Sequence, residues 1–300
     1  MKNKKTFKIA IIGLGMVGTA IGHLLSKSGH KIVAISDKSS AALKRAVPYT
    51  GGISFRDSKK AILEADCILI TTPDDFISEA CEKIADSKLV QDKFVFHMSG
   101  AGSLDFLKSA ETAGALTAVI HPLQSFSSID TAISNIPGSV FGITASKKAQ
   151  KNALVIVRNL NGIPIFIKSA QKPLYHAAAC IASNYMVSLL NIVEIIYESI
   201  GISNENARRA YLPLIYGTLH NIEQKGSIQA LTGPIARGDE GTIKKHILAL
   251  DKNLPQYLSL YSSLGLITTD IAQKKGTLSS RQAKNINDFL KGVIDYEHSK

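Results

Sequence analysis

A stretch near the middle of the chain, KPLYHAAACIASN, surrounds a small apolar centre with side chains that can transfer protons or bind polar groups. At 100° per residue on an α-helix, Lys172, His176 and Ser183 fall within about 40° of one another. Tyr175 flanks this strip on one side, and Asn184 lies further round on the other. The spacing therefore predicts a polar helix face that either meets water or lines a cavity.

Polar motifs also follow three predicted strands in the first half of the chain. These motifs are Thr72-Pro73-Asp74-Asp75, His97-Met98-Ser99-Gly100 and His121-Pro122-Leu123-Gln124. The carboxyl ends of parallel strands meet at one edge of a sheet, which is where ligands bind in such folds. Three strand ends of this kind indicate a site, although each motif alone could be a turn or a helix cap.

A second informative segment, LTGPIARGDEGTIKKHILAL, lies in the last third of the chain. Gly233 and Gly238 shape a loop in it, and Asp239 is placed to cap the helix that follows. Arg237 could bind a substrate carboxylate through two parallel hydrogen bonds. It could equally pair with Asp239 or with other surface acids, and the sequence leaves both interpretations open.

The elements that would position these side chains begin with KIAIIGLGMVGTAIGHLLSKSG, residues 8–29. A β-branched run precedes Gly13, Gly15 and Gly18 in G-x-G-x-x-G spacing, and a helical pattern follows. The first glycine allows a tight turn, the second lets a pyrophosphate approach the backbone, and the third lets the helix pack on the strand. Because the next strand, 31–36, follows on schedule, this segment predicts a dinucleotide site.

The end of the second strand should discriminate between NAD and NADP. Asp37 is placed to bind ribose hydroxyls, which favours NAD, whereas Lys38 with Ser39 and Ser40 could bind a 2′-phosphate. A cation with two hydroxyls suits a phosphate group, so we favour NADP. The other residues expected to contact the cofactor are Met16 and Val17 in the glycine turn and Thr72, Pro73 and Ser99 at strand ends.

Strands and helices alternate through the first half of the chain, and helices alone fill the second. Strands are expected at 67–72, 93–98, 116–120, 139–144 and 163–167, and helices at 58–65, 75–86, 103–113 and 147–160. Helical patterns then occupy 171–200, 203–224, 239–251, 254–273 and 279–292, with Gly201 and Gly226 as stops and Ser203 and Ser279 as N-caps. The order predicts an α/β fold in which a doubly wound parallel sheet precedes an all-helical domain.

The composition, with 45% apolar and 20% charged residues, is that of an ordinary globular protein. The net charge of +11 comes from scattered lysines without interleaved aromatics, so we expect a basic solvated surface and no nucleic-acid partner. Three cysteines without metal-type spacing indicate reduced thiols in a cytoplasmic protein and no bound metal. The apolar stretch 186–202 contains Asn191, Glu194 and Glu198, which predicts a buried bundle helix rather than a membrane span.

These residues together resemble a known family. GLGMVG, PDD, HMSG, HPLQSF, KPLYHAAACIASNY and LTGPIARGD are similar to motifs of Rossmann-like NADP oxidoreductases with a helical C-terminal domain of formerly unknown function. This family is related to pyrroline-5-carboxylate reductase and to 6-phosphogluconate dehydrogenase-like enzymes, and some members act as an alternative ketopantoate reductase. The resemblance covers nearly the whole chain. It implies a Rossmann domain over 1–168 and a helical substrate and dimerisation domain over 169–300, with NADP as cofactor, NAD as the alternative, and a homodimer.

The resemblance also implies a mechanism. Lys172 takes the position of the catalytic acid, His176 stands where an asparagine is often found, and Asn184 lies two turns further on. The expected reaction is hydride transfer from the nicotinamide to a small 2-oxo acid such as ketopantoate, with Lys172 as proton donor. Lys172 could instead simply begin a helix ahead of Pro173.

Several alternatives stay open at this stage. The residues expected to bind substrate are His97, His121, Gln124, Ser183 and Arg237, and the two histidines compete with Lys172 for the role of proton donor. An imine reductase of the pyrroline-5-carboxylate type would have the same architecture and need less help from an acid. A non-catalytic protein that senses NADP(H) is a third interpretation.

Overall fold

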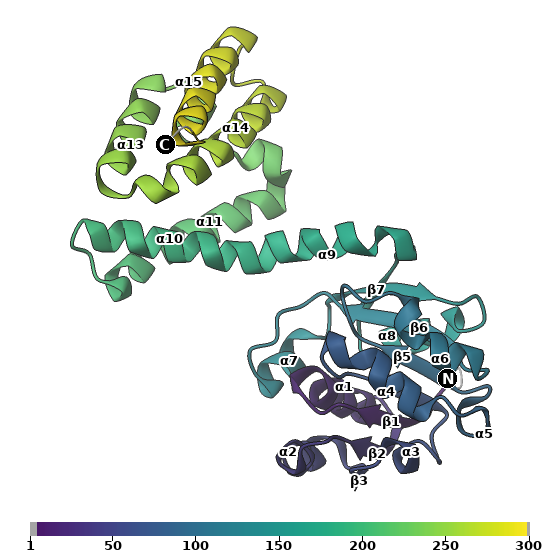
Figure 1. Ribbon diagram of the computed structural model, residues 1–300. Coiled ribbons are helices and arrows are strands. Elements are labelled where there is room, and N and C mark those ends of the chain that lie inside the picture. Colours follow the sequence, from purple (N-terminus) through teal and green to yellow (C-terminus); the bar gives the residue numbers. More distant parts are fainter. Residues whose placement is uncertain (1–4, 299–300) are drawn as a thin grey trace. The chain divides into compact units, whose positions relative to one another are not determined.

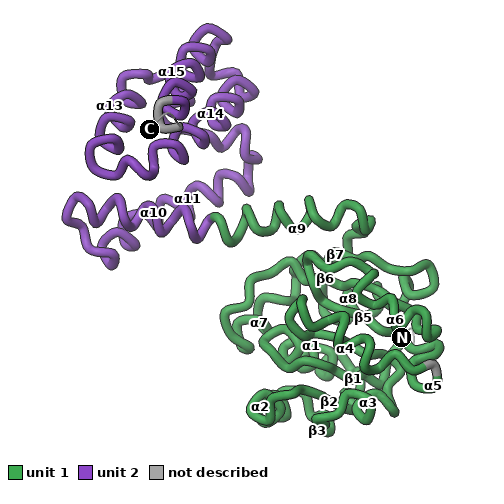
Figure 2. Tube along the Cα trace, in the orientation of Figure 1, with its two compact units in different colours: residues 1–185 green, residues 186–300 purple. Residues whose placement is uncertain are grey.

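The computed structural model describes residues 5–298 and divides the chain into two compact units, residues 1–185 and 186–300 (Figure 2). The first unit alternates strands and helices (Figure 1). In chain order its elements are β1 (Lys8–Ile12), α1 (Met16–Lys27), β2 (Lys31–Ser36), α2 (Ser40–Thr50), β3 (Ile53–Phe55), α3 (Ser58–Ala61), β4 (Cys67–Ile70), η1 (Asp74–Phe76), α4 (Ile77–Ile84), α5 (Ser87–Val90), β5 (Phe94–His97), η2 (Leu104–Leu107), α6 (Lys108–Thr112), β6 (Leu116–Pro122), α7 (Ile129–Asn135), β7 (Val140–Ala145), α8 (Gln150–Asn159), β8 (Ile163–Phe166), η3 (Ser169–Gln171), α9 (Lys172–Cys180) and the π-helical turn Ile181–Tyr185.

The strands form one sheet in the order β3-β2-β1-β4-β5-β6-β7-β8. Neighbouring strands are parallel except β6 and β7, which are antiparallel. The predicted α/β fold with a doubly wound parallel sheet is confirmed, with one antiparallel pair in an otherwise parallel sheet. The connection through α7 returns to the edge of β6 without crossing the sheet, which gives antiparallel neighbours. The strand order reverses between β1 and β4.

The two faces of the sheet are buried by different helices, and β1 shows how the sequence divides them. Ile9 and Ile11 belong to a core cluster that contains residues of α1 and α8. Ala10 and Ile12 belong to a second cluster, with residues of α3, α4 and α6. Because side chains alternate along a strand, a continuous apolar run such as KIAII is what a strand covered on both faces requires.

The turn after β1 brings α1 into backbone contact with the end of β4. Gly13 has a φ of 93°, which L-residues rarely adopt. A Cβ on Gly18 would stand 2.2 Å from the carbonyl oxygen of Gly13 and 2.3 Å from Oγ1 of Thr71. The Thr71 hydroxyl donates a hydrogen bond to that same oxygen at 2.6 Å. Gly13 and Gly18 therefore serve the turn and the close helix packing that their spacing predicted.

The boundary between the compact units lies at residue 185, whereas the sequence predicted a boundary at 168. The last strand, β8, ends close to the predicted point. The first unit nevertheless includes α9, because Nζ of Lys172 donates a hydrogen bond to the carbonyl oxygen of Ser99 at 3.3 Å. In addition, the Tyr175 hydroxyl lies 3.0 Å from Nδ1 of His121. The helix that follows the last strand is thus packed on the end of the sheet.

The second unit consists of helices. They are α10 (Met186–Ser199), α11 (Asn204–Ala230), α12 (Pro234–Arg237), α13 (Glu240–Asn253), η5 (Pro255–Tyr257), α14 (Leu258–Lys275) and α15 (Ser280–His298). Ser203, Asp239 and Ser279 accept hydrogen bonds from backbone N–H groups of the first turns of α11, α13 and α15, as expected of N-caps. Gly226 has a non-helical φ of 76° and interrupts α11, which agrees with its predicted role as a stop.

α10 differs from the buried bundle helix predicted for 186–202. Within the described residues no side chain of α10 is buried, and Val187 is 68% exposed. Its polar residues do not mark an interior, because Glu194 instead accepts a hydrogen bond from the hydroxyl of Tyr211 and pairs with Arg208 on α11. By length and composition alone, the helical stretch Ser169–Ser199 could cross a membrane, a test that core helices of soluble proteins also pass.

Gly18→Ala should lower the free energy of unfolding by about 1–3 kcal/mol, because the added methyl group forces α1 away from the carbonyl oxygen of Gly13 and the hydroxyl of Thr71. Gly15→Ala is the matched control, since no described heavy atom lies within 4 Å of where its Cβ would stand. Urea denaturation followed by circular dichroism measures both. Equal stability of the two variants would contradict the close approach of α1 to β4.

Candidate functional site

A cavity of about 620 Å³ opens in the first unit where the strand order reverses. Its wall comes from the loops after β1, β2, β4 and β5, and this is the position where parallel α/β sheets bind ligands. The lining residues are Ile12, Gly13, Leu14, Gly15, Met16, Val17, Ser36, Asp37, Lys38, Arg56, Ser58, Thr71, Thr72, Pro73, Asp74, Phe76, Glu79, Ala80, Lys83, Met98, Ser99 and Phe126.

The glycine turn forms one side of the cavity. Gly13, Gly15, Met16 and Val17 line it, as their predicted contact with a cofactor requires. Gly15 stands directly before the first residue of α1, and the space where its side chain would lie is open. The first N–H groups of a helix have no acceptor within the helix and carry positive partial charge, so an anionic group suits this position. Gly18 serves packing and does not line the cavity.

Asp37 has a role that the sequence did not indicate. Its Oδ2 accepts a hydrogen bond from the backbone N–H of Leu14 at 2.7 Å, and its Oδ1 accepts one from the N–H of Ser39 at 2.7 Å. Both carboxylate oxygens therefore hold the glycine turn and the start of α2 in place. This engagement reduces the capacity of Asp37 to bind ribose hydroxyls, the contact on which a preference for NAD would depend.

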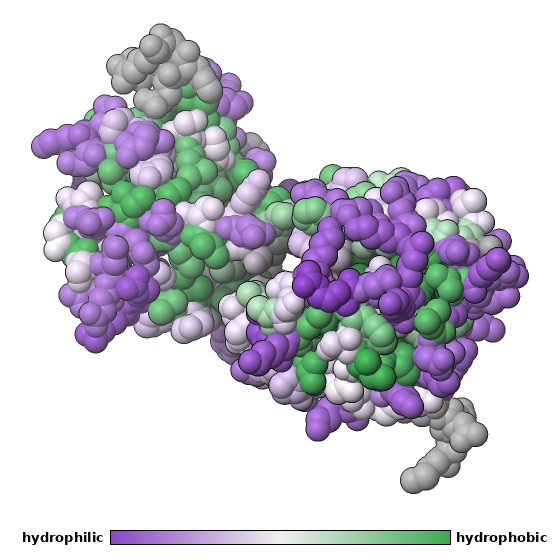
Figure 3. Space-filling model, turned by 60° about the horizontal axis from the view of Figure 1, so that its bottom comes forward, coloured by the Kyte–Doolittle hydropathy of each residue, from purple (hydrophilic) through white to green (hydrophobic). Residues whose placement is uncertain are grey.

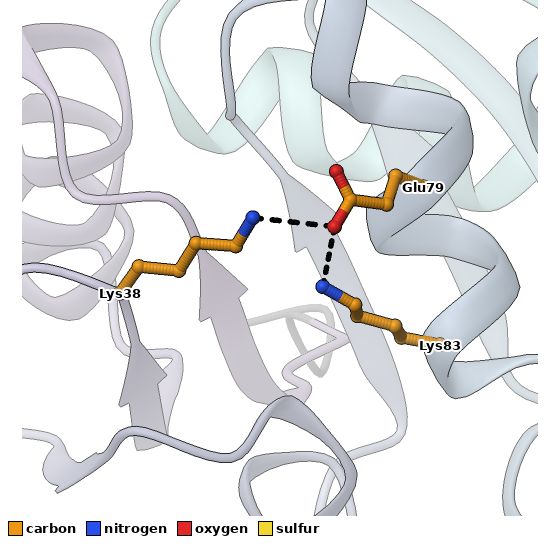
Figure 4. Close-up of polar contacts among 3 residues, drawn as sticks. All are labelled: Lys38, Glu79 and Lys83. Atoms are coloured by element: carbon orange, nitrogen blue, oxygen red, sulfur yellow. Dashed lines mark hydrogen bonds and ion pairs between the residues drawn. The ribbon is translucent and has the colours of Figure 1, made fainter.

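Basic side chains from the loop after β2 and from α4 also line the cavity. Lys38 and Lys83 both pair with Oε1 of Glu79 (Figure 4). These two ion pairs lower the pKa of Glu79, with Lys83 as the larger cause. The ammonium of Lys38 also lies 5.5 Å from the centre of the Phe76 ring. Lys38 is largely exposed and Lys83 about half exposed, so both ammonium groups are accessible to an anionic ligand.

Arg56 and Ser58 also line the cavity, and the sequence analysis missed them. They follow β3, a strand of three residues that was not predicted. The Arg56 guanidinium donates a hydrogen bond to Oγ of Ser40 at 3.1 Å, which joins it to the start of α2. Ser39, in contrast, uses its hydroxyl to cap α2 by accepting a bond from Ala42. The Ile-Ser-Phe alternation after Gly51-Gly52 was the available signal for β3.

Ser99 connects the cavity wall to several neighbours. Its N–H donates to Nδ1 of His97 at 3.1 Å, and its Oγ accepts from the N–H of Gly102 at 2.7 Å. Its hydroxyl donates to Oδ2 of Asp74 at 2.6 Å, and its carbonyl oxygen accepts from Nζ of Lys172 at 3.3 Å. Because each polar group of Ser99 is engaged, the loop after β5 has a fixed shape.

Lys172 is buried beside this loop and is 2% exposed. It does not itself line the cavity, but its ammonium bonds to Ser99, which does. Burial lowers its pKa to about 8, and the negative charge of Asp74 acts in the opposite direction. A lysine with this pKa is mostly protonated at neutral pH and can lose its proton readily.

His97 and His121 are held neutral. Burial is the main cause that lowers the pKa of each to about 4, and the charge of Lys172 adds to it. Since Nδ1 of His97 accepts from Ser99, its Nε2 carries the proton and donates to the carbonyl oxygen of Ser103 at 3.0 Å. Both nitrogens of this fully buried ring are therefore hydrogen-bonded to backbone groups. This arrangement does not fit the predicted contact of His97 with a substrate. His121 is less enclosed and faces Tyr175.

His176 lies beside His121, with ring centres 6.1 Å apart. Its Nδ1 is buried without a hydrogen-bond partner among the described residues and packs against Gly100. Its Nε2 lies 3.6 Å from Sγ of Cys180. Gly100 permits this packing, because a Cβ there would stand 2.5 Å from His176 and 2.8 Å from His121. The catalytic role of His176 stays a prediction.

The remaining predicted residues lie outside the cavity lining. Ser183 and Asn184 are exposed on the π-helical turn that follows α9, where the angular spacing of an α-helix no longer applies. Gln124 uses its amide locally, bonding to Ser139 and to the N–H of Ser125. Arg237 is exposed at the end of α12 in the second unit, and its predicted clamp stays a prediction.

Thr72 carries a further indication of a ligand. Its Oγ1 faces no hydrogen-bond partner among the described residues although the atom is buried, and Thr72 lines the cavity beside Pro73. A buried hydroxyl without a partner is costly, and a polar group in the cavity would satisfy it. Thr72 and Pro73 thus lie where the sequence predicted them.

Comparison with known proteins agrees with this architecture. Residues 2–122 match a family described as a Rossmann-like domain, and residues 139–268 match a domain of unknown function, DUF2520. Protein TM1727 from Thermotoga maritima is 24% identical with a TM-score of 0.72, over 89% of this chain and 99% of that one. A Bacteroides fragilis protein described as an NADP oxidoreductase is 18% identical with a TM-score of 0.67, over 90% and 98%. Pyrroline carboxylate reductase from Plasmodium falciparum, solved with NADP bound, is 15% identical with a TM-score of 0.58, over 96% and 99%.

The low pKa of Lys172 predicts a pH dependence of stability. Its pKa is about 8 in the fold against an ordinary 10.5, so between these values the unfolded chain keeps a proton that the folded chain has lost. The wild type should therefore gain stability relative to Lys172→Met as the pH rises through this window, by a total on the order of 3 kcal/mol. Urea denaturation at a series of pH values measures the difference.

Lys148→Met, which changes an exposed lysine, is the control for this titration. Its stability difference from the wild type should not follow the same course. If the difference between Lys172→Met and wild type stayed constant between about pH 7.5 and 9.5, the lowered pKa of Lys172 would be refuted.

Proposed function

We propose that this chain, in which a Rossmann-like domain precedes a DUF2520 domain, is an NADPH-dependent reductase of a small 2-oxo acid, with ketopantoate as the first candidate substrate. The observation that carries the proposal is the contact between Nζ of Lys172 and Ser99 in the wall of the glycine-turn cavity. It brings a buried proton donor to the edge of a site suited to a dinucleotide.

The residues of the cavity fit NADP. The open space at Gly15 and the start of α1 suit the pyrophosphate, and Lys38 with Arg56 suits a 2′-phosphate. Each carboxylate oxygen of Asp37 already accepts one backbone N–H, which leaves Asp37 fewer acceptor positions for the hydroxyls of NAD. The buried hydroxyl of Thr72 awaits a polar partner at the same site. The NADP named for two similar structures supports the same choice.

The protein contributes a proton and its placement. The bound cofactor supplies the hydride that reduces the substrate carbonyl. Lys172 donates a proton from Nζ to the carbonyl oxygen, and its pKa of about 8 suits exchange with water near neutral pH. His97 and His121, held neutral by burial, do not compete for this role.

A second candidate is an imine reductase of the pyrroline-5-carboxylate type. The similarity to Plasmodium falciparum pyrroline carboxylate reductase extends over 96% of this chain, and that likeness favours the second candidate. An iminium substrate already carries its proton, so this reaction would depend less on Lys172. A non-catalytic NADP(H) sensor would bind the cofactor without turnover.

We extend the proposal to a cytoplasmic homodimer. Large apolar side chains that are exposed on α10 and α11 support the dimer. The exposed fraction is 68% for Val187, 71% for Leu214 and 64% for Tyr216. Apolar side chains also interrupt the polar surface in Figure 3. Apolar exposure on this scale is typical of surfaces that another protein covers. Sedimentation equilibrium tests the oligomeric state.

The cofactor choice can be tested at Lys38 and Arg56. Lys38→Ala and Arg56→Ala should each weaken NADPH binding about tenfold and leave NADH binding within about twofold, because each removes a charged donor to the 2′-phosphate. Quenching of NADPH fluorescence or calorimetry gives the dissociation constants. Lys60→Ala, an exposed lysine on α3 outside the cavity lining, is the control. Equal losses for NADPH and NADH would argue against a phosphate site here.

The reaction can be tested by following NADPH absorbance with a panel of 2-oxo acids, including ketopantoate, and of cyclic imines, including pyrroline-5-carboxylate. With an oxo acid, Lys172→Met should lower kcat by about 100- to 10,000-fold while NADPH binding stays unchanged. With an imine the loss should be much smaller.

Each outcome of this panel separates the candidates. Unchanged turnover of an oxo acid by Lys172→Met would exclude Lys172 as the proton donor. Turnover of imines alone would favour the second candidate. Tight NADPH binding without oxidation by any member of the panel would favour the sensor.

A further inference from the structure

We infer that Asp74 is a positioning residue that keeps Lys172 protonated and in place against Ser99 in the cavity wall, acting through the hydroxyl and the carbonyl oxygen of Ser99. The inference deepens the proposed function and rests on it for the meaning of the proton. Asp74 was noted in the sequence as part of a strand-end motif and of the PDD motif in the family likeness, and neither assigned it a role or a contact.

The hydrogen bonds of Ser99 connect the carboxylate of Asp74 to the ammonium of Lys172. Oγ of Ser99 accepts from the N–H of Gly102, so its own proton goes to Oδ2 of Asp74 at 2.6 Å. The Ser99 N–H is committed to His97, and the carbonyl oxygen accepts from Nζ of Lys172. With its amide group and its hydroxyl both fixed, Ser99 has one orientation, in which its carbonyl oxygen faces the ammonium.

The charges around Lys172 give Asp74 its electrostatic role. His97 from β5 and His121 from β6 face this region as neutral rings, and His176 on the same helix lies beside His121. None of these three rings carries a negative charge that would stabilise the ammonium of Lys172. Asp74 supplies a negative charge that favours the protonated form of Lys172, against the effect of burial.

The position of Asp74 links this effect to ligand binding. It begins η1, directly after Thr72 and Pro73, and it lines the cavity, whereas Lys172 lies behind Ser99. Its carboxylate is exposed in the structure described here, so water screens its charge. A ligand that fills the cavity would exclude that water and strengthen the attraction between Asp74 and Lys172. The proton donor would then be charged most firmly when the site is occupied.

Asp74→Asn is the appropriate variant, because the amide oxygen can still accept the Ser99 hydroxyl while the charge is lost. The pKa of Lys172 should fall by about half a pH unit to one pH unit. NMR of protein labelled with ¹³C-lysine follows the Cε resonance through a pH titration, and comparison with Lys172→Met assigns it. This measurement requires no substrate. Asp75→Asn, a neighbour on the same turn and outside the cavity lining, should leave the pKa of Lys172 unchanged.

The pH profile of kcat supplies the second measurement once a substrate is established. Asp74→Asn should shift the basic limb to lower pH, so that activity at about pH 8.5 falls roughly three- to tenfold while activity at about pH 6.5 stays within about twofold. A merely structural role would lower activity equally at both values. Ser99→Ala, which removes the donor to Asp74, should lower kcat at both.

An unchanged pKa of Lys172 in Asp74→Asn would overturn the inference, whether or not the protein is a reductase. A lowered pKa supports it. A lowered pKa in a protein that oxidises no NADPH would leave the coupling of Asp74 and Lys172 standing and remove the proposed function instead. The two failures are thus distinguishable.

Discussion

The closeness of α1 to the end of β4 is the constraint on which the cavity depends. The Gly13 carbonyl oxygen receives the Thr71 hydroxyl, and no side chain can be inserted at Gly18 without separating the two elements. Asp37 then fastens the turn from the other side through Leu14. A turn held by a neighbouring strand end on one side and a carboxylate on the other fixes the start of α1, whose first N–H groups have no acceptor within the helix, beside the cavity without a ligand to organise it.

The parts of the fold that local sequence determines could be predicted. The glycine spacing and the run KIAII specify their own turn and strand, and the strand-end position of Thr72 and Ser99 followed from topology alone. The part of the site built by Arg56 could not be predicted, because β3 has three residues and a weak periodic signal. The use of Asp37 depends on a contact with Leu14, 23 residues earlier, which no local pattern encodes.

Burial, rather than residue type, decides which base of the site carries a proton. The sequence favoured Lys172 as the proton donor and left His97 and His121 as alternatives. Enclosure lowers the pKa of every one of them, but the lysine starts from a much higher value and is the one left charged at neutral pH. Histidines that titrate near neutrality in water are thus neutral here, and His97 supports the loop that carries Ser99 through its hydrogen bonds to backbone groups.

The π-helical turn Ile181–Tyr185 gives the helical run from α9 to α10 two angular phases. Each extra residue in a helical turn shifts the phase of the α-helical pattern by about 100°, the angle that one residue occupies. An amphipathic pattern that starts at Lys172 therefore ends at Cys180, and a new one begins at Met186. Sequence comparison across this run must realign at the turn, since the α-helical spacing of 100° per residue cannot be carried from α9 into α10.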